Sequence, residues 1–374
     1  MSTPTTPPLS GPEFGSYGPD EVTWLLKDLS HVALEGAIAD REKAIQSGRA
    51  HYAESLPVEF QPDAEYQKLF RTTLSESADR LAVAIGAVTD LLIADRGTDL
   101  TLVSLARAGT PVGILMRRWA GRIHGLDLPH YTISIVRDRG IDSVALDYIT
   151  GRHRPESVVF VDGWTGKGAI ARELSAALAG YAAAGGPALS DDLAVLADPG
   201  YCVRTFGTRD DFLIASACLN STVSGLVSRT VLNSDHIGPG EFHGAKFYRE
   251  LAPYDMSNLL LDTVTDRFSA VREAAAHQCA QVLATDREPT WAGWRSIEQV
   301  QHRYGLGSIN FVKPGVGETT RVLLRRVPRK ILVDAPDRPE HEHIRLLAAQ
   351  REVPVEVVDR LAYSCVGLIK ESTE

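Results

Sequence analysis

The stretch Ser157-Val158-Val159-Phe160-Val161-Asp162-Gly163-Trp164-Thr165-Gly166-Lys167-Gly168-Ala169-Ile170 decides the fold class of this chain. Its apolar run, residues 158–161, is typical of a strand buried in a parallel sheet, and Asp162 stands at the carboxyl end of that strand. A glycine-spaced turn and an alanine-rich helix over residues 170–184 follow. Ligands of open α/β sheets bind outside the carboxyl ends of strands, and the amides of a glycine-rich turn attract phosphate. The stretch therefore predicts a phosphorylated ligand whose hydroxyl groups bind Asp162.

The glycines of this turn match neither of the two commonest phosphate-binding motifs. A Walker loop requires Gly-x-x-x-x-Gly-Lys-Ser/Thr, whereas Val161 occupies its first glycine position and Gly168 follows the lysine. A dinucleotide fingerprint requires Gly-x-Gly-x-x-Gly, but Gly163, Gly166 and Gly168 have the reverse spacing. An ordinary strand-to-helix turn that binds no ligand also fits this stretch when it is taken alone.

Composition places the chain among globular proteins. Its 374 residues allow two or three domains, and the hydrophobic content of 44% and charged content of 23% are ordinary values. No apolar run approaches the ~18 residues of a membrane span, so we expect no membrane partner. A net charge of −9 disfavours nonspecific nucleic-acid binding by the whole surface. The four cysteines have no paired spacing, which argues against a disulfide framework or a zinc site and favours a cytoplasmic protein.

The hydrophobic pattern divides the chain into four segments. Residues 1–18 are rich in Pro, Ser, Thr and Gly and lack a basic start and an apolar core, which predicts a disordered lead and not a signal peptide. Residues 19–96 have helical periodicity, with a long helix expected over residues 75–93, and strands alternate with helices over residues 97–290. Residues 300–374 form a separate, small α/β unit. The chain is therefore expected to be an α/β protein with a doubly wound parallel sheet. Its predicted strands are residues 100–105, 131–136, 158–161, 193–198, 212–215, 330–334, 355–358 and 365–369.

The order of strand, acidic residue, short Gly/Thr loop and helix resembles the signature of the type I phosphoribosyltransferases. Two earlier strand ends extend the resemblance. Ala106-Arg107-Ala108-Gly109 is similar to the pyrophosphate loop of that family, and Arg137-Asp138-Arg139-Gly140 stands where the family has a mobile cationic loop. The resemblance implies Mg²⁺-dependent transfer from phosphoribosyl pyrophosphate, or from a nucleotide-like phosphosugar, to a nitrogenous acceptor that the sequence does not identify.

The same resemblance implies the roles of individual residues. The catalytic residues would be Asp162, Arg107, Arg137 and Arg139. The substrate-binding residues would be Ala106, Ala108, Gly109, Gly163, Trp164, Thr165, Gly166, Lys167, Gly168 and Ala169. Most family members have two adjacent acids before the loop, but here Gly163 replaces the second one. Either the donor is not ordinary phosphoribosyl pyrophosphate or another acid, such as Asp198, compensates. The scheme assigns no side chain as a metal ligand, and Asp162 is its one candidate for that role.

A narrower resemblance covers most of the chain after about Gly18. The phosphate turn, the stretches 216–225 and 242–248 and the C-terminal unit look like a bacterial family encoded near tellurite-resistance and stress genes. That family joins an orotate-phosphoribosyltransferase-like domain to a Pelota-type RNA-binding domain, and its members are also labelled predicted cysteine proteases. The resemblance implies that RNA is a partner of the C-terminal domain. Its RNA-binding residues would be Lys313, Gly315, Gly317, Glu318 and Arg321.

Phosphoribosyl transfer is the main expectation, and two alternatives stay open. One is a cysteine peptidase in which Cys218 is the nucleophile, His243 the base and Asp255 the group that orients it. Against it, Cys218 follows an apolar run, where a cysteine is usually a small packing residue. The other is a sensor without catalytic activity that binds nucleotide or RNA through the same loops. Association into a homodimer is a further possibility.

Overall fold

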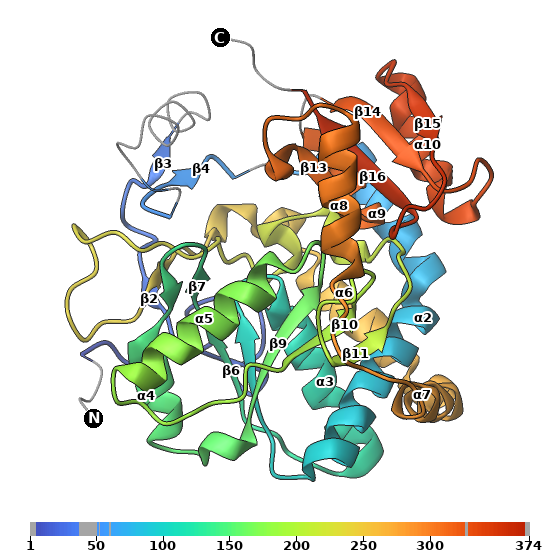
Figure 1. The fold of residues 1–374 in the computed structure, drawn as a ribbon. Helices are drawn as coiled ribbons and strands as arrows, with labels where there is room; N and C mark the ends of the chain where they lie inside the picture. The colour runs from blue at the N-terminus through green and yellow to red at the C-terminus, as the bar shows by residue number, and fades with distance from the viewer. Residues whose placement is uncertain (1–4, 37–50, 52, 60, 326–327, 371–374) are drawn as a thin grey trace.

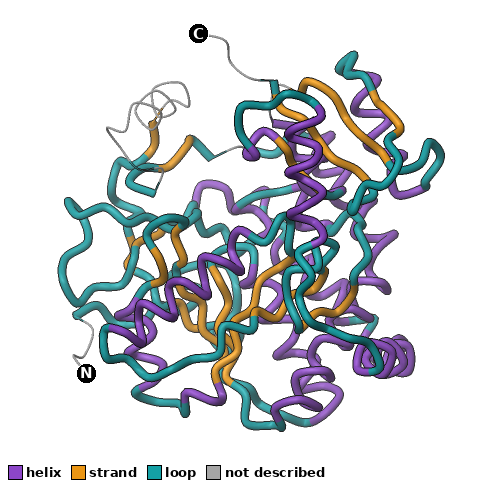
Figure 2. Tube along the Cα trace, in the orientation of Figure 1, coloured by secondary structure: helices purple, strands orange, loops and turns teal. Residues whose placement is uncertain are grey.

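The computed structural model describes residues 5–36, 51, 53–59, 61–325 and 328–370. Its centre is a six-stranded parallel sheet in the order β1-β6-β5-β9-β10-β11. Helices lie on both sides of the strands (Figures 1 and 2). The strands of this sheet are β1 Thr23–Trp24, β5 Thr101–Leu105, β6 His130–Ile133, β9 Val158–Trp164, β10 Leu193–Ala197 and β11 Thr205–Thr208. An α/β fold with a central parallel sheet is therefore confirmed.

The strands form because their apolar side chains are covered on both faces. In β9, Val158 and Phe160 point into one apolar cluster, and Val159 and Val161 point into another. The first cluster contains residues of α4 (Ser143–Thr150) and α5 (Ala169–Ala183); the second contains residues of α2 (Ala64–Arg96) and α3 (Gly109–His124). This arrangement explains why continuous apolar runs, and not alternating ones, predicted the central strands.

Helix α2 is the longest element among the described residues, and it packs on both the main sheet and the C-terminal domain. Asp63 caps its first turn by accepting a hydrogen bond from the amide of Tyr66 (2.9 Å). The helix ends at Gly97, whose φ of 79° is left-handed. Sequence analysis predicted a helix only over residues 75–93 within a helical segment 19–96. The observed helix is longer because its first turns, which include Phe70, are buried under the C-terminal part of the chain.

The segment before α2 differs from expectation, because residues 19–36 form turns and short strands. Strand β1 joins the edge of the main sheet, β2 (Lys27–Asp28) pairs with β12 (Gly244–Ala245), and β3 (Glu35–Gly36) pairs with β4 (Leu56–Pro57).

Residues 5–18, predicted as a disordered lead, are ordered. Phe14 and Tyr17 are 1% and 2% exposed, and both pack on Trp24. The aromatic residues supply apolar contact area among the prolines, serines and glycines that suggested disorder. Residues 1–4 lie outside the described part of the chain.

A small C-terminal domain follows α6 (Ser257–Thr265) and α7 (Phe268–Leu283). Its sheet has four strands in the order β13-β16-β14-β15, with parallel and antiparallel pairs. Helix α8 packs its Ile297 and Val300 on Val312 of this sheet, so the domain begins before the predicted position 300. The elements are α8 Ala292–Arg303, β13 Val312–Pro314, α9 Val316–Arg325, β14 Pro328–Val333, α10 Glu342–Gln350, β15 Val355–Val357 and β16 Cys365–Ile369.

The C-terminal domain packs directly on the first domain (Figure 1). Val316 and Leu323 of α9 belong to the same apolar cluster as Phe70 of α2 and Ala217. The phenol of Tyr66 donates a hydrogen bond to the carbonyl oxygen of Leu324 (2.7 Å). A contact surface of this kind fixes the C-terminal domain over the main sheet.

One predicted strand was wrong, and both edge strands of the main sheet, β1 and β11, were missed. Residues 212–215 are not a strand; their apolar side chains pack beside α2, where Arg80 stacks on the ring of Phe212 (4.1 Å to the centroid), and they lead into the short helix η2 Ala215–Cys218. Strand β11 forms one edge of the sheet, and its sequence Thr-Phe-Gly-Thr has no apolar run. Within the described residues, no helix combines the length and apolarity that a membrane crossing requires.

Candidate functional site

A cleft of about 430 Å³ opens at the carboxyl ends of β5 and β9, where the two domains meet. A second hollow of about 260 Å³ adjoins it over the glycine-rich loop and shares several of its lining residues. The first domain contributes the loop after β5, the end of β9 and Asn220, and the C-terminal domain contributes β13 and α9. The side chains that carry the polar character of the cleft are Arg107, Asp162, Asn220, Lys313, Glu318 and Arg321.

Asp162 lies at the floor of this cleft. Its Oδ1 accepts a hydrogen bond from the amide of Gly163 (2.8 Å). Burial raises the pKa of Asp162 to about 6, although the Gly163 amide and the positive charge of Arg321 act in the opposite direction. The guanidinium of Arg321 also lies 5.0 Å from the ring centroid of Trp164, so the residue next to Gly163 stacks against the C-terminal domain.

The glycine-rich loop that follows Asp162 is attached to the C-terminal domain. The carbonyl oxygen of Gly166 accepts a hydrogen bond from the phenol of Tyr363 (2.9 Å). The ammonium of Lys167 donates to the carbonyl of Ile309 (3.0 Å) and to Oδ1 of Asn310 (3.1 Å). Burial and the nearby positive charges of Lys313 and Arg137 lower the pKa of Lys167 to about 8. Ala169 begins α5, and Gly168 before it is left-handed (φ 78°).

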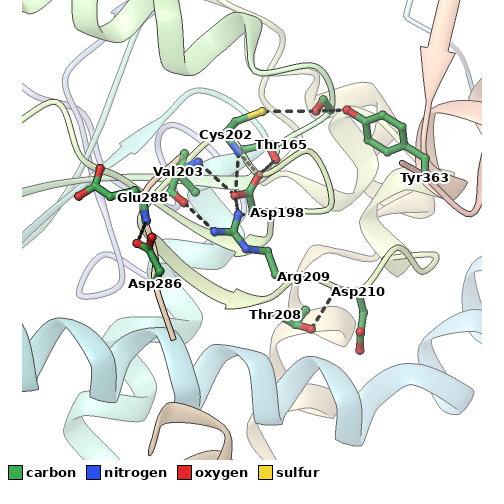
Figure 3. Close-up of polar contacts among 11 residues, drawn as sticks. Thr165, Asp198, Cys202, Val203, Thr208, Arg209, Asp210, Asp286, Glu288 and Tyr363 are labelled. Carbon is green, nitrogen blue, oxygen red and sulfur yellow. Dashed lines mark hydrogen bonds and ion pairs between the residues drawn. The ribbon is translucent and has the colours of Figure 1, made fainter. Parts of the chain in front are cut away.

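A buried polar network centred on Asp198 fixes the glycine-rich loop through Thr165 (Figure 3). Asp198 has no exposed surface, pairs with Arg209 and accepts the hydroxyl hydrogen of Thr165 and the amide of Cys202 (3.0 Å). Sequence analysis offered Asp198 as a second acid for a sugar. The structure corrects this, because Asp198 is occupied by its internal partners and serves to fix the loop.

Arg107 also lines the cleft, and it lies beside a largely buried carboxylate, Glu59, that was not predicted from the sequence. Its guanidinium lies 3.5 Å from Oε2 of Glu59 and donates to the carbonyl of Val227 (3.3 Å). Glu59 also accepts hydrogen bonds from the amide and hydroxyl of Ser221 (3.0 and 2.9 Å). Burial acts to raise the pKa of Glu59, but Arg107 and Ser221 outweigh it and hold that pKa below its usual value. The sequence around Glu59 contains no motif that would have predicted this contact.

The remaining loop residues expected at the site are distributed unevenly. Ala106 and Ala108 line the main cleft, and Gly109 begins α3 against the backbone of Val161. Arg137 lines the smaller hollow. Arg139 lies 3.5 Å from Glu54 in an exposed ion pair, after the hairpin strand β7 (Ile135–Val136) and before β8 (Gly140–Ile141).

The residues expected to meet RNA fall into two groups. Lys313, Glu318 and Arg321 line the cleft. Gly315 and Gly317 instead pack on the first domain: a Cβ at Gly315 would lie 3.0 Å from Oδ1 of Asp211, and one at Gly317 would lie 3.2 Å from the side chain of Ala217.

Asp211 holds the start of α9 in place. Its Oδ1 accepts the amide of Val316 (2.8 Å), and its Oδ2 accepts the amide and the hydroxyl of Ser364 (both 2.9 Å). A carboxylate at a helix N-terminus is favoured by the free amides and by the helix dipole. Of the predicted RNA-binding residues, those with polar side chains therefore line the cleft, and the glycines pack on the first domain.

The four cysteines are all buried and free of disulfides. Burial and the charge of Asp198 raise the pKa of Cys202 to about 12. Burial likewise raises the pKa of Cys279 and of Cys365. Cys218 ends η2 in the apolar cluster beneath the cleft. The carbonyl of the preceding residue, Ala217, accepts a hydrogen bond from Nε of Arg321 (3.1 Å).

His243 lies beside the end of β6. Its Nδ1 is 2.9 Å from the hydroxyl of Ser134, whose neighbour Ile135 lines the cleft. Its amide donates to Oδ2 of Asp142 (2.6 Å), and burial lowers the pKa of its imidazole. The expected orienting residue Asp255 instead accepts the amide of Ser257 (2.9 Å) at the start of α6. Asp142, which caps α4, is the carboxylate next to His243.

Comparison with known proteins gives a consistent result. A family described as "Tellurite-like stress resistance cysteine protease StiP" matches residues 15–265, and a PELOTA RNA binding domain matches residues 291–371. The protein "Cysteine protease StiP" of Acinetobacter baylyi (strain ATCC 33305 / BD413 / ADP1) is 35% identical over 371 residues, which cover 96% of this chain and 94% of that protein. The resemblance to the tellurite-resistance family and the Pelota-type domain are thus confirmed.

The same comparison overturns the main functional expectation. The family and the relative are both described as cysteine proteases, so the predictions of a phosphoribosyltransferase and of phosphoribosyl pyrophosphate as its partner were wrong, and the peptidase alternative is favoured. Mg²⁺ was predicted only as the metal ion of phosphoribosyl transfer. Among the described residues, no group of three or more His, Cys, Asp or Glu side chains is arranged to hold a metal ion.

Proposed function

Because this chain belongs to the StiP family of tellurite-like stress resistance cysteine proteases, we propose that it is a peptidase whose nucleophile is the thiol of Cys218. The observation that carries this proposal is the position of Cys218 at the end of η2, buried beside residues that contact or line the interdomain cleft. Ala217, just before Cys218, is hydrogen-bonded to Arg321, and Asn220, two residues after it, lines the cleft.

The other three cysteines fit the role poorly. The family match ends at residue 265, so Cys279 and Cys365 lie outside it. Cys202 lies inside the match, but its pKa of about 12 and the neighbouring carboxylate of Asp198 oppose formation of a thiolate. A reactive cysteine needs positive neighbours that favour the thiolate. The segment of Cys218 contacts a cation of the cleft, because Nε of Arg321 donates to the carbonyl of Ala217.

His243 is the proposed base. Its lowered pKa keeps the imidazole neutral near pH 7, as a proton acceptor requires. Since Nδ1 contacts Ser134, the proton passes to Nε2, and the carboxylate of Asp142 favours the imidazolium that results.

The reaction proceeds through a covalent acyl-enzyme. The sulfur of Cys218 attacks the carbonyl carbon of the peptide bond, the C–N bond breaks, and His243 returns the proton to the leaving amine. Water then hydrolyses the thioester. Cys218 has no exposed surface, so a substrate reaches it only by displacing the side chains that line the cleft beside η2, Asn220 and Arg321.

The C-terminal domain supports a second activity. We propose that it binds RNA, since it matches a PELOTA RNA binding domain and places Lys313 and Arg321 in the lining of the cleft. The four free cysteines also fit a reducing compartment, and we propose a cytoplasmic location.

The peptidase proposal is tested by comparing Cys218→Ala with Cys202→Ala in the full chain. Both replace a buried thiol by a methyl group. Cleavage of unfolded casein and of a fluorogenic peptide mixture should fall by about 10³-fold or more in Cys218→Ala, because the nucleophile is lost, and should persist in Cys202→Ala. Equal activity in the two variants, or loss only in Cys202→Ala, would refute the assignment of Cys218.

A further inference from the structure

We infer that RNA binds in the cleft between the two domains, on residues of both, and that bound RNA excludes a peptide from Cys218. This inference rests on the proposed function of each domain. It concerns where RNA lies, and it adds residues of the first domain to the RNA site.

The cationic side chains of the C-terminal domain face the first domain across the cleft. Lys313 and Arg321 line both the 430 Å³ cleft and the adjoining 260 Å³ hollow. In the smaller hollow they share the lining with Arg137 and Lys167 of the first domain. An RNA strand that reaches Lys313 or Arg321 therefore also meets the first domain.

The C-terminal domain is fixed in this position by apolar packing and by hydrogen bonds at three places. Tyr66 bonds to the carbonyl of Leu324, Asp211 bonds to the amide of Val316, and Tyr363 bonds to the carbonyl of Gly166. Since the apolar cluster runs continuously from α2 into α9, separating the domains would expose buried apolar surface. RNA therefore reaches the loop by entering the cleft and not by binding a detached domain.

The charges of the cleft suit a phosphodiester chain. Besides burial, the positive charges of Lys313 and Arg137 lower the pKa of Lys167, so these cations from both domains are close enough to repel one another. A phosphate between them would replace repulsion by attraction. The carboxylate of Asp162, at the floor beside Arg321, is an acceptor for a ribose 2′-hydroxyl. A peptide offers neither group regularly, which favours RNA over a protein partner.

Arg321 connects this site with the peptidase. Its Nε donates to the carbonyl of Ala217, one residue before Cys218, and its Nη1 is 2.9 Å from Glu318. A phosphate bound to this guanidinium would occupy the space in front of η2. Peptide and RNA would then compete for one cleft.

The test measures binding of a fluorescein-labelled single-stranded oligouridylate to the full chain by anisotropy. Lys313→Ala and Arg137→Ala change one cation in each domain, and Arg154→Ala removes a cation paired with Asp99 on the exposed surface. Each cleft variant loses a charge-assisted contact and should bind the oligouridylate about tenfold more weakly. The affinity of Arg154→Ala should be the same as that of the unmodified chain. Unchanged binding in Arg137→Ala, or no binding by the unmodified chain, would overturn the inference.

Acetylation of lysines gives a readout that does not depend on peptidase activity. Saturating oligouridylate should slow acetylation of Lys167, which lines the hollow, but not of Lys330, which is paired with Glu356 (2.6 Å). The same oligouridylate should inhibit peptide cleavage. Protection of Lys167 without any cleavage by the protein would sink the peptidase proposal and leave the shared RNA site standing. Cleavage that continues undiminished while Lys167 is protected would overturn the claim of competition.

Discussion

Asp162 gives the sharpest physical prediction, because its burial links stability to pH. Its pKa is about 6 in the folded protein against the ordinary value of 3.8. Each tenfold change in proton affinity is worth about 1.4 kcal/mol, so the ionised carboxylate destabilises the fold by about 3 kcal/mol. Asp162→Asn removes the charge and keeps an oxygen that can accept the amide of Gly163. We therefore expect this variant to be more stable than the unmodified protein above pH 6.

The sign follows from the direction of the pKa change. The folded state binds the proton of Asp162 more tightly than the unfolded state, so folding is unaffected below the unfolded pKa and is penalised as pH rises through the folded pKa. The gain from Asp162→Asn should be about 3 kcal/mol at pH 8, about half of that at pH 5 and close to zero near pH 3.5.

Urea unfolding followed by tryptophan fluorescence at pH 5 and pH 8 measures the difference in the free energy of unfolding. Asp99→Asn is the matched control, since Asp99 has 67% of its side chain exposed and pairs with Arg154 at the surface. An exposed pair contributes about 0–1 kcal/mol, so the control should change little at either pH. If Asp162→Asn is no more stable than the unmodified protein at pH 8, or if its gain does not shrink at pH 5, the carboxylate is not desolvated and the reasoning is wrong.

Three further predictions follow from single contacts. Arg209→Ala leaves the buried Asp198 without its cation and should lower the free energy of unfolding by about 3–5 kcal/mol in urea titrations. Tyr66→Phe removes the bond to the carbonyl of Leu324 and should cost about 1–3 kcal/mol, seen as earlier loss of the C-terminal domain in proteolysis. Because burial lowers the pKa of His243 from 6.5, the acidic limb of the peptidase rate should lie below pH 6.5; a limb above that value would exclude His243 as the base.

The sequence was sufficient for the centre of the fold and insufficient for its edges. Strands β5, β9 and β10 are buried on both faces, so their residues form continuous apolar runs that can be recognised without a structure. Edge strands β1 and β11 lack such runs: β1 has two residues, and β11 contains Gly207, which packs against the backbone of Ala84. These strands form by pairing with strands elsewhere in the chain, and the hydrophobic pattern of their own residues does not predict that pairing.

The site shows the same limit at the level of single residues. The end of β9 and the loop after β5 were located correctly at one cleft, because carboxyl ends of parallel strands meet at one edge of a sheet. Glu59 and Asp142 were missed, since each contacts the site only through the tertiary fold: Glu59 meets Arg107, and Asp142 meets the amide of His243. Neither lies in a motif that could have identified it.

The glycine-rich loop explains why the functional prediction was wrong although the geometry was partly right. Small residues at a strand-to-helix turn allow close approach of any neighbour, and here the close neighbours belong to the protein itself. Gly200 approaches the carbonyl of Gly166, and Tyr363 of the C-terminal domain donates to that same carbonyl. The spacing of the glycines indicated that another group lies close to the loop backbone. It did not show whether that group is a ligand phosphate or part of the protein itself.

Arg321 shows why a domain-by-domain interpretation of this sequence is incomplete. Its guanidinium contacts the carbonyl of Ala217 and the ring of Trp164 in the first domain, and Glu318 within its own helix. A charge placed this way is neither a free RNA contact nor a simple packing residue. Substituting it would change the wall beside Cys218 and the floor beside Asp162 together. The cleft is therefore formed by the interface, and its chemistry depends on both domains because each supplies only part of the lining residues.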